Sequence, residues 1–281
     1  MIGVSSSMAF NSIRLRLIFA LGIGLFSIQA MSEFNIEGNF IQGGFAIGSG
    51  AKGLEIWQDD EKLRVTGSGL FLLGFGRDAP KISIIRYKNA KGEIKEQFLK
   101  IKKRKYNIQK INGLPPKKVS PTTKEDLKQI STEIQQIKNA RSISINQEYF
   151  NSGFMWPVKG FISGVYGSQR ILNGKPRRPH YGIDIIGEVG TPIVAPADGV
   201  VTLVQANNFF SGNTLIIDHG YRLSSAFLHL SQITVKNGQF IKKGQIIGKI
   251  GSTGRSTGPH LDWRINLRQH RIDPQLLVPP M

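Results

Sequence analysis

The chain has 281 residues, 40% of them hydrophobic and 20% charged, a length and composition that exclude a mainly disordered protein and allow one large or two modest domains. It carries 37 Lys and Arg against 19 Asp and Glu, a formal net charge of +18, so polyanions are the expected partners: nucleic acid, an anionic lipid surface or an acidic cell-wall polymer. The sequence contains no cysteine, which excludes disulfides and thiol nucleophiles and leaves histidine and carboxylates to hold any catalytic metal.

An export segment is predicted at residues 1–30. Arg14 and Arg16 precede the apolar run "LIFALGIGLFSIQA", and no charged residue follows until Glu33. This run is short for a bilayer span of roughly 20 apolar residues, and the small Ala30 at its end is typical of a cleaved signal peptide. An uncleaved anchor in the inner membrane is the alternative. Either interpretation places the rest of the chain in the periplasm or cell envelope, and cleavage predicts a mature chain that begins near Met31.

Residues 34–112 are predicted to form a β-sandwich-like module with a structural role. Apolar residues alternate with polar ones, as at Leu63 and Val65 and at Ile82 and Ile84, which predicts half-buried antiparallel strands. The segment "NAKGE" at 89–93 has the composition of a hairpin turn. The basic run "KIKKRKY" at 100–106 is interpreted as a solvated face, and because no nucleic-acid-binding module accompanies it, nucleic acid is not an expected partner.

Residues 113–149 are predicted to be a Pro-rich linker followed by a helix. The stretch "GLPPKKVSP" at 113–121 is expected to hold no regular structure. Thr122 and Glu125 have the spacing of a capping box. An apolar stripe then recurs at helical spacing, which favours a helix packed against its own domain over a partner-binding helix; its members are Leu127, Ile130, Ile134 and Ile137.

Residues 150–281 return to short β segments separated by Gly, Asn and Asp, and three of these segments contain histidine. "PHYGID" places His180 and Asp184 four residues apart; because a straight strand would separate their Cα atoms by roughly 13 Å, shared metal binding requires a bend, expected at Gly182. "FLHLS" places His229 in an apolar strand, where a histidine satisfied by the backbone is the alternative to a functional one. "GPHLDW" places His260 and Asp262 on one face of a strand.

The three segments occur in this order, with "GTPIVAPADGVV" at 190–201 and "VKNGQFIKKGQIIGKIG" at 235–251 between them. In this arrangement they resemble the lysostaphin-like, or LytM-domain, zinc metallopeptidases over residues 154–275. The resemblance implies a mostly β chain with a C-terminal antiparallel LytM-type domain, preceded by the β module and connecting helix found in some exported members. It also implies an exported metallo-endopeptidase that hydrolyses peptide cross-links of peptidoglycan with a metal-activated water. His180 and Asp184 correspond to metal ligands, and His229 and His260 to histidines that activate water or stabilise the oxyanion.

Asp262 departs from the family pattern, which has a ligand histidine at this position. The ligand set implied for one Zn²⁺ is therefore His180, Asp184 and Asp262, and carboxylate oxygen is an accepted zinc ligand. Two carboxylates are expected to weaken the Lewis acidity of the ion, to raise the pKa of its bound water and to allow a harder ion such as manganese.

The alternative function is a non-catalytic LytM-domain protein that binds the wall or regulates a hydrolase. Peptidoglycan is the expected partner under both interpretations, with an additional contact to an anionic membrane surface. The cleaved cross-link and the oligomeric state cannot be read from the sequence. His219 and His270 lie outside the matched positions and are expected to be structural or surface residues, whereas Tyr181 and Trp263 are expected to flank the site, mainly by packing.

Overall fold

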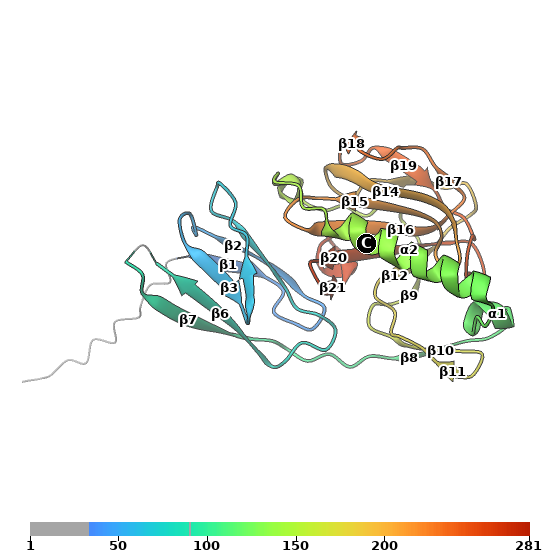
Figure 1. Ribbon diagram of the computed structural model, residues 1–281, viewed down its shortest axis with the longest axis horizontal. Coiled ribbons are helices and arrows are strands. Elements are labelled where there is room, and N and C mark those ends of the chain that lie inside the picture. Colours follow the sequence, from blue (N-terminus) through green and yellow to red (C-terminus); the bar gives the residue numbers. More distant parts are fainter. Residues whose placement is uncertain (1–33, 90) are drawn as a thin grey trace, which may run out of the picture. The chain divides into compact units, whose positions relative to one another are not determined.

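A β-sandwich forms the first part of the computed structural model, which describes residues 34–89 and 91–281 (Figure 1). One antiparallel sheet contains β1 (Asn35–Gly38), β2 (Phe45–Ser49) and β5 (Phe71–Gly74). The other contains β4 (Glu61–Leu63), β3 (Glu55–Gln58), β6 (Ile82–Lys88) and β7 (Ile94–Lys100). Side chains from both sheets share one apolar core, among them Phe71, Ile56 and Ile85. The expected hairpin turn at 89–93 joins β6 to β7.

The face of β6 that points into this core differs from the prediction. Ser83, Ile85 and Tyr87 are buried, whereas Ile82 is 51% exposed. Side chains alternate between the two faces of a strand, so Ser83, Ile85 and Tyr87 share one face and Ile82 and Ile84 share the other. In the structure the first face packs into the core, and Ile82 and Ile84 point outward. Asp59 stabilises the polar Ser83 within this set through hydrogen bonds from the serine hydroxyl to its carboxylate.

Residues 108–119 join the sandwich to the second part of the chain. Strand β8 (Ile108–Ile111) pairs in parallel with β10 (Gln169–Leu172), which in turn pairs with β11 (Lys175–Pro176). The expectation of no regular structure at 113–121 is wrong, since α1 (Pro116–Val119) forms there with a proline in its first turn. A proline is tolerated in a first turn because the amide hydrogen that it lacks would have no partner inside the helix. Val119 and Leu114 pack on Leu172.

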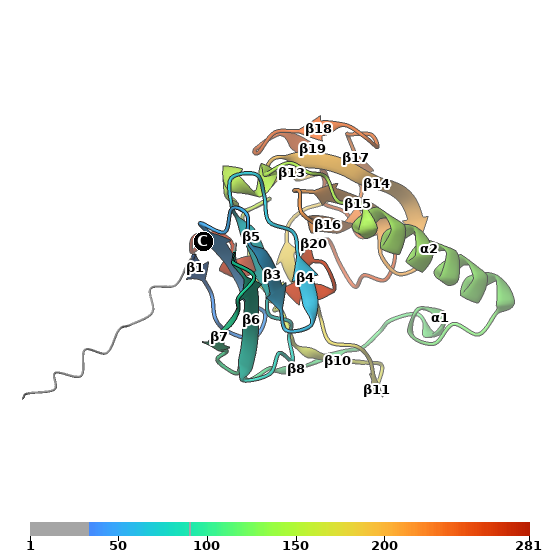
Figure 2. The same ribbon diagram turned by 60° about the vertical axis from the view of Figure 1, so that its left-hand side comes forward.

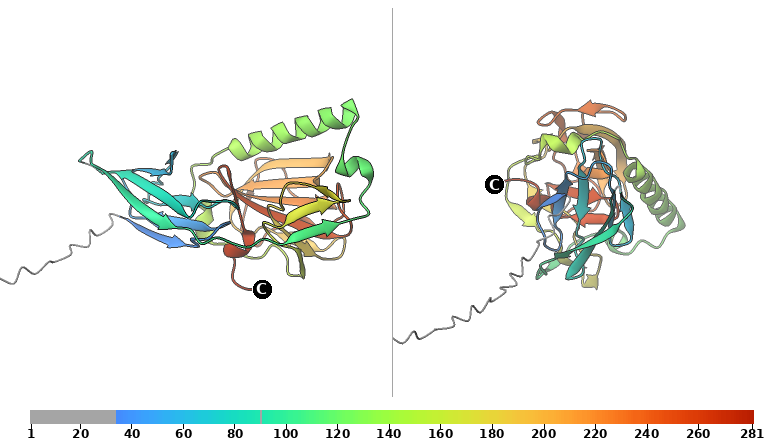
Figure 3. Two further views of the ribbon diagram at one scale, coloured as in Figure 1. Left: turned by 90° about the horizontal axis from the view of Figure 1, so that it is seen from below. Right: turned by 90° about the vertical axis from the view of Figure 1, so that its left-hand side faces the viewer.

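Helix α2 (Lys124–Ser142) runs along one face of the C-terminal sheet (Figures 1 and 3). Its cap is Thr123, whose hydroxyl accepts a hydrogen bond from the Asp126 amide, so the predicted capping box at Thr122 lies one residue too early. Only the C-terminal end of the apolar stripe packs closely: Ile137 and the buried Ala140 contact a cluster formed by Ile216, Ala226 and Leu228. Leu127 is 50% exposed and Ile134 61% exposed, so the prediction of a continuous packing face is wrong for these positions.

The C-terminal part is built on an eight-stranded, antiparallel sheet (Figure 2). Its strands, in spatial order, are β18 (Phe240–Ile241), β14 (Gly199–Asn208), β15 (Gly212–Asp218), β16 (Leu223–Leu230), β20 (His260–Leu267), β12 (Ile183–Ile186) and β9 (Ile162–Gly164), with β21 (His270–Ile272) paired to β20. A smaller sheet contains β13 (Pro192–Val194), β19 (Ile246–Lys249) and β17 (Gln232–Ile233). Two short 3₁₀ helices, η1 (Tyr149–Ser152) and η2 (Pro274–Leu276), complete the elements. The predicted mostly β, antiparallel fold is confirmed.

The described residues form one compact unit. Within them, no helix is both long and apolar enough to cross a bilayer. The predicted export segment at 1–30 lies outside the described residues, and the proposed boundaries at 112 and 150 stay predictions.

His219 is expected to make stability depend on pH. It is fully buried; its Nδ1 lies 2.6 Å from the Asp198 carbonyl and its Nε2 lies 2.7 Å from the Ser225 hydroxyl, which confirms the structural role predicted for it. Burial lowers the pKa of His219 from 6.5 to about 4. The unfolded chain therefore binds a proton that the folded chain does not, and stability is lost as the pH falls from 6.5 to about 4, by about 3 kcal/mol from this group.

Urea unfolding measured between about pH 4 and pH 7 tests this expectation. His219→Gln should lower stability at neutral pH and flatten the dependence on pH relative to the unmodified chain. Burial raises the pKa of neighbouring Asp218 to about 6, which gives an opposite slope in both proteins. The comparison therefore concerns the difference between the two curves, and parallel curves would show that His219 titrates alike in the folded and unfolded chains.

Candidate metal centre and catalytic histidines

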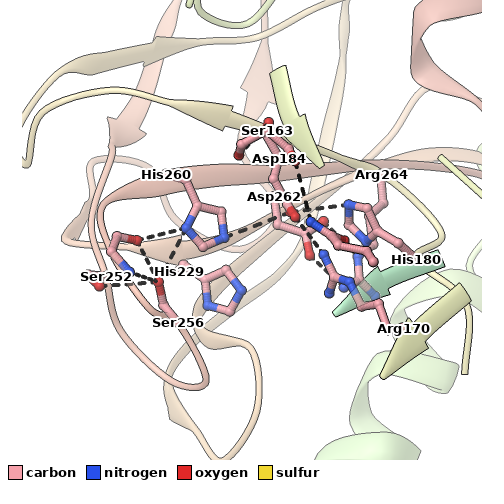
Figure 4. A network of polar contacts seen from close by, with 12 residues as sticks. Ser163, Arg170, His180, Asp184, His229, Ser252, Ser256, His260, Asp262 and Arg264 are labelled. Carbon is pink, nitrogen blue, oxygen red and sulfur yellow. Dashed lines mark hydrogen bonds and ion pairs between the residues drawn. The ribbon is translucent and has the colours of Figure 1, made fainter. Parts of the chain in front are cut away.

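Three predicted metal ligands converge where β12 and β20 pair. Asp184 lies opposite Asp262 in the register of these strands, and the chain bends at Gly182, as predicted, so that His180 returns toward both carboxylates. One ligand atom from each of His180, Asp184 and Asp262 lies within 4.8 Å of the other two, and all three residues are buried (Figure 4). A Cβ at position 182 would lie 2.5 Å from the Trp263 carbonyl oxygen and 2.9 Å from an Asp262 carboxylate oxygen, so only glycine permits this approach.

His180 and Asp184 carry buried polar atoms without hydrogen-bond partners. Both ring nitrogens of His180 and Oδ1 of Asp184 are in this state, although His180 Nε2 lies 3.1 Å from that oxygen. The other carboxylate oxygen, Oδ2, accepts a hydrogen bond of 2.5 Å from Arg170. A Cβ on Gly164 would lie 2.1 Å from Oδ2, so this glycine makes room for the carboxylate. Burial opposes ionisation of Asp184, but the charges of His180 and Arg170 outweigh it and lower the pKa.

Asp262 is fully buried and holds a bidentate ion pair with Arg264. Nε of Arg264 donates to Oδ1 over 2.8 Å, and a terminal nitrogen donates to Oδ2 over 2.6 Å. Burial again opposes ionisation, but the charge and hydrogen bonds of Arg264 hold the pKa of Asp262 well below its usual range. Both aspartates of the cluster are therefore anionic, and each is bound by an arginine from one side.

The cluster fits a divalent cation. His180 and Asp184 offer unpartnered donor atoms at close range, which is costly in a buried site unless a further group binds them. Each carboxylate oxygen has two lone pairs, so Asp262 can accept from Arg264 and still coordinate an ion. One imidazole and two carboxylates form a donor set that Zn²⁺ accepts. The arginines correspond to the outer hydrogen bonds that orient ligating carboxylates in metal sites.

Two further histidines face this cluster from β16 and β20. Nδ1 of His229 lies 2.7 Å from the Thr253 carbonyl, and Nδ1 of His260 lies 2.8 Å from the Gly258 carbonyl, so each carries its proton on Nδ1 and leaves Nε2 free as an acceptor. Their ring centroids are 4.8 Å apart, and Nε2 of His260 lies 3.8 Å from Asp184 Oδ1. Burial lowers the pKa of His229 to about 4, which keeps the ring neutral near pH 7.

The backbone at His229 explains how a strand residue points into the site. Its φ is 64°, in the left-handed region that non-glycine residues rarely adopt. Two residues of β16, Leu228 and His229, lie between the positions that pair with Leu215 and Asn213, so the strand bulges there. Bulges of this kind re-aim side chains beside active sites. The local alternative of a core histidine is therefore less consistent with the structure than a functional one.

Three of the five residues, Asp184, His229 and His260, line a small pocket of about 180 Å³ together with Ser256 and Thr257. Sequence reasoning missed Arg170, Arg264 and Gly164, all of which contact the two carboxylates. Arg264 could have been found, since it follows Asp262 by two residues and must share its face of β20. Arg170 could not, because only the fold brings β10 to this site.

The other residues singled out in the sequence occupy supporting positions. Trp263 is fully buried on the opposite face of β20 and packs edge-on against Trp156, with ring centroids 6.1 Å apart, which confirms the packing role. His270 is partly buried in β21, away from the ligand cluster. Tyr181 is partly exposed and borders a larger cavity beside the site.

Comparison with known proteins identifies the part of the chain that carries these residues. Residues 178–274 match the model of Peptidase family M23. Over 103 residues the chain is 41% identical to the peptidoglycan DD-endopeptidase ShyA of Vibrio cholerae, a match that covers 37% of this chain and 24% of ShyA. It is 40% identical over 142 residues to ShyC of the same organism, which covers 47% of this chain and 33% of ShyC. The matches thus span a quarter to a third of those relatives' lengths.

The likeness extends further along a solved structure. A putative M23 peptidase from Pseudomonas aeruginosa superposes with a TM-score of 0.66 at 29% sequence identity. The alignment covers 85% of this chain and 95% of that one, so it reaches well beyond residues 178–274.

Proposed function

Since residues 178–274 form a domain of peptidase family M23, we propose that this chain is a metallo-endopeptidase that hydrolyses peptide cross-links of peptidoglycan. The observation that carries the proposal is the convergence of His180, Asp184 and Asp262 within 4.8 Å, beside two histidines with free Nε2 atoms. Relatives with the same domain are named peptidoglycan DD-endopeptidases, which supports the substrate class.

In this proposal His180, Asp184 and Asp262 hold one Zn²⁺, which supplies Lewis acidity for peptide-bond hydrolysis. Arg170 and Arg264 orient the two carboxylates and offset part of their negative charge. The weakening of Lewis acidity expected from two carboxylates is reduced accordingly, and zinc needs no replacement by a harder ion.

The two histidines of the pocket move protons. With Nδ1 held by a backbone carbonyl, the Nε2 of His229 accepts a proton from the attacking water. Once protonated, an imidazole at this position becomes a donor that can stabilise the oxyanion or protonate the leaving amine. His260 presents its Nε2 to the same pocket, and the 4.8 Å between the ring centroids supports a shared role of both Nε2 atoms at one scissile bond.

Location follows from the substrate. We place the protein in the cell envelope, exported through the segment at 1–30, because cross-linked peptidoglycan lies outside the cytoplasm. The net charge of +18 favours accumulation at the anionic wall and membrane surface.

A non-catalytic wall-binding protein is the second candidate, and the arginines favour it. Arg264 already binds both oxygens of Asp262, and Arg170 binds Asp184, so the two carboxylates are partly satisfied without an ion. In that case the domain would bind the wall without hydrolysing it.

Metal content and peptidoglycan digestion separate the two candidates. The purified chain is expected to contain one zinc by elemental mass spectrometry and to convert cross-linked fragments of isolated peptidoglycan into monomers, as scored by chromatography. Chelation should stop cleavage, and added zinc should restore it. Sedimentation with sacculi in the absence of both metal and cleavage would favour the wall-binding candidate.

A further inference from the structure

A cavity of about 800 Å³ lies between α2 and the C-terminal sheet, next to the candidate metal centre. His180 and His229 line it, and it shares Arg170 and Arg255 with the smaller pocket at the catalytic histidines. Figures 1 and 3 show α2 running along this side of the sheet. The cavity and the reacting groups are therefore neighbours, and a ligand that occupies one can reach the other.

The lining of this cavity carries a large excess of positive charge. Nine arginines and Lys138 contribute to it, against Glu133 as the single acid. Both oxygens of Glu133 accept from the Phe209 amide, so they do not pair with the arginines. Arg170, Arg264 and Arg268 bind carboxylates outside the lining. In the described part of the chain, the six others have no carboxylate within ion-pair distance: Arg141, Arg177, Arg178, Arg222, Arg255 and Arg271.

Arg141, on the last turn of α2, shows this excess most clearly. Its Nε is buried without a hydrogen-bond partner, as is the Nε of Arg222 across the cavity lining. Burial and the charges of Arg271 and Arg264 lower the pKa of Arg141 well below its usual value. Arginine nevertheless stays protonated in proteins, so its charge remains in the cavity without a counter-ion. Leaving such a charge partly buried without a counter-ion is costly, and an anion bound beside Arg141 would offset this cost.

We propose that this cavity binds the carboxylate groups of a short acidic peptide, the stem of the peptidoglycan whose bond is cut at the adjacent metal centre. The proposal rests on the proposed function for the identity of the peptide. Planar guanidinium groups bind carboxylates in bidentate fashion, and Arg141, Arg222 and Arg271 are the residues assigned to this role.

The rest of the lining favours a peptide over a small inorganic anion. Ile130, Ile134 and Ile137 of α2 add an apolar surface to this basic lining, and Ile134 is 61% exposed. A volume of about 800 Å³ is in the range of sites that enclose a ligand of several residues and far exceeds the need of one phosphate. Methyl groups and carboxylates along one short peptide would match the apolar and the basic parts of this lining.

The test uses calorimetric titration of the full chain with a synthetic stem tetrapeptide, L-alanyl-γ-D-glutamyl-meso-diaminopimelyl-D-alanine. The same peptide with its carboxylates converted to carboxamides is the matched ligand. We expect the amidated peptide to bind at least ~10-fold more weakly, since a hydrogen bond to a charged group contributes more than a neutral one. Arg141→Gln and Arg271→Gln should each weaken binding of the acidic peptide by about 10-fold.

Lys236→Gln is the matched control, because it removes one positive charge from an exposed loop outside the cavity and should leave binding unchanged. Arg141→Lys keeps the positive charge but loses the planar guanidinium group. Its affinity for the acidic peptide should lie between those of the unmodified chain and Arg141→Gln, which would show that the loss in Arg141→Gln does not come from misfolding. Equal binding of the two peptides would overturn the proposal. Binding of poly(glycerol phosphate) without binding of the acidic peptide would also overturn it, in favour of a phosphate-polymer site.

Peptidoglycan digestion by the same preparations is scored separately. If the acidic peptide binds more tightly than the amidated one but no peptidoglycan is cleaved, the cavity is a peptide site and the proposed endopeptidase activity is wrong. If peptidoglycan is cleaved but the two peptides bind equally, the endopeptidase activity stands and the carboxylate site is wrong.

Discussion

Asp262→Ala is expected to deplete the purified protein of zinc and to reduce peptidoglycan cleavage to background. The carboxylate is fully buried within 4.8 Å of the donor atoms of His180 and Asp184, so its removal leaves two protein ligands. It also leaves Arg264 beside the remaining ligands without its bidentate partner, and the unpaired cation repels a divalent ion. Metal content per folded chain, measured after dialysis against a weak chelator, is the direct readout.

Asp273→Ala is the matched control for this experiment. Asp273 is a buried aspartate that accepts a 2.7 Å hydrogen bond from Arg104, so its loss also breaks an aspartate–arginine pair, but outside the ligand cluster. It should retain zinc. Asp262→His should retain zinc as well, since imidazole restores a neutral ligand. Full zinc content in Asp262→Ala would contradict the assignment of Asp262 as a metal ligand. It would show that this carboxylate forms an ion pair with Arg264 and does not bind the metal.

His229→Ala is expected to lower kcat by about 10²–10⁴-fold while zinc stays bound. Its Nε2 is free because Nδ1 is held by the Thr253 carbonyl, and burial lowers the pKa of the ring to about 4, so the residue is a neutral proton acceptor. It is not part of the cluster of ligand atoms. Single-turnover cleavage of a cross-linked muropeptide, together with metal analysis, separates the loss of proton transfer from the loss of the ion.

His219→Gln serves as the comparison, because His219 is an equally buried histidine that bonds Asp198 and Ser225 away from the pocket. At neutral pH this variant should keep both zinc and most activity. Loss of zinc from His229→Ala would show that the division into ligands and proton carriers is wrong.

The sequence predicted those features that depend on local pattern. The strand around His260 and Asp262 formed with the expected face, because alternation of apolar and polar residues fixes which side chains share a face. The bend at Gly182 was required by distance alone: only a bent chain brings His180 within 4.8 Å of both carboxylate partners. The hairpin at 89–93 followed from its turn residues.

Features that depend on distant partners were missed. Ile82 and Ile85 are both apolar, and only packing against the second sheet decided that Ile85 is buried. The apolar stripe of α2 was interpreted as a packing face because periodicity reports which residues share a side, not what lies opposite; here Ile134 borders the cavity. The contact of Arg170 with Asp184 joins β10 to β12, a strand of a different sheet, which no local pattern encodes.

The parallel pairing of β8 with β10 has a consequence for the design of shorter proteins. Gln169 to Leu172 hydrogen-bond with Ile108 to Ile111, and Arg170 within this stretch holds Asp184. A truncated protein that starts at the M23 match would lack Arg170 itself, together with β10 and the strand that pairs with it. The smallest fragment able to fold with an intact centre therefore begins upstream of residue 108, some seventy residues before the family match at 178.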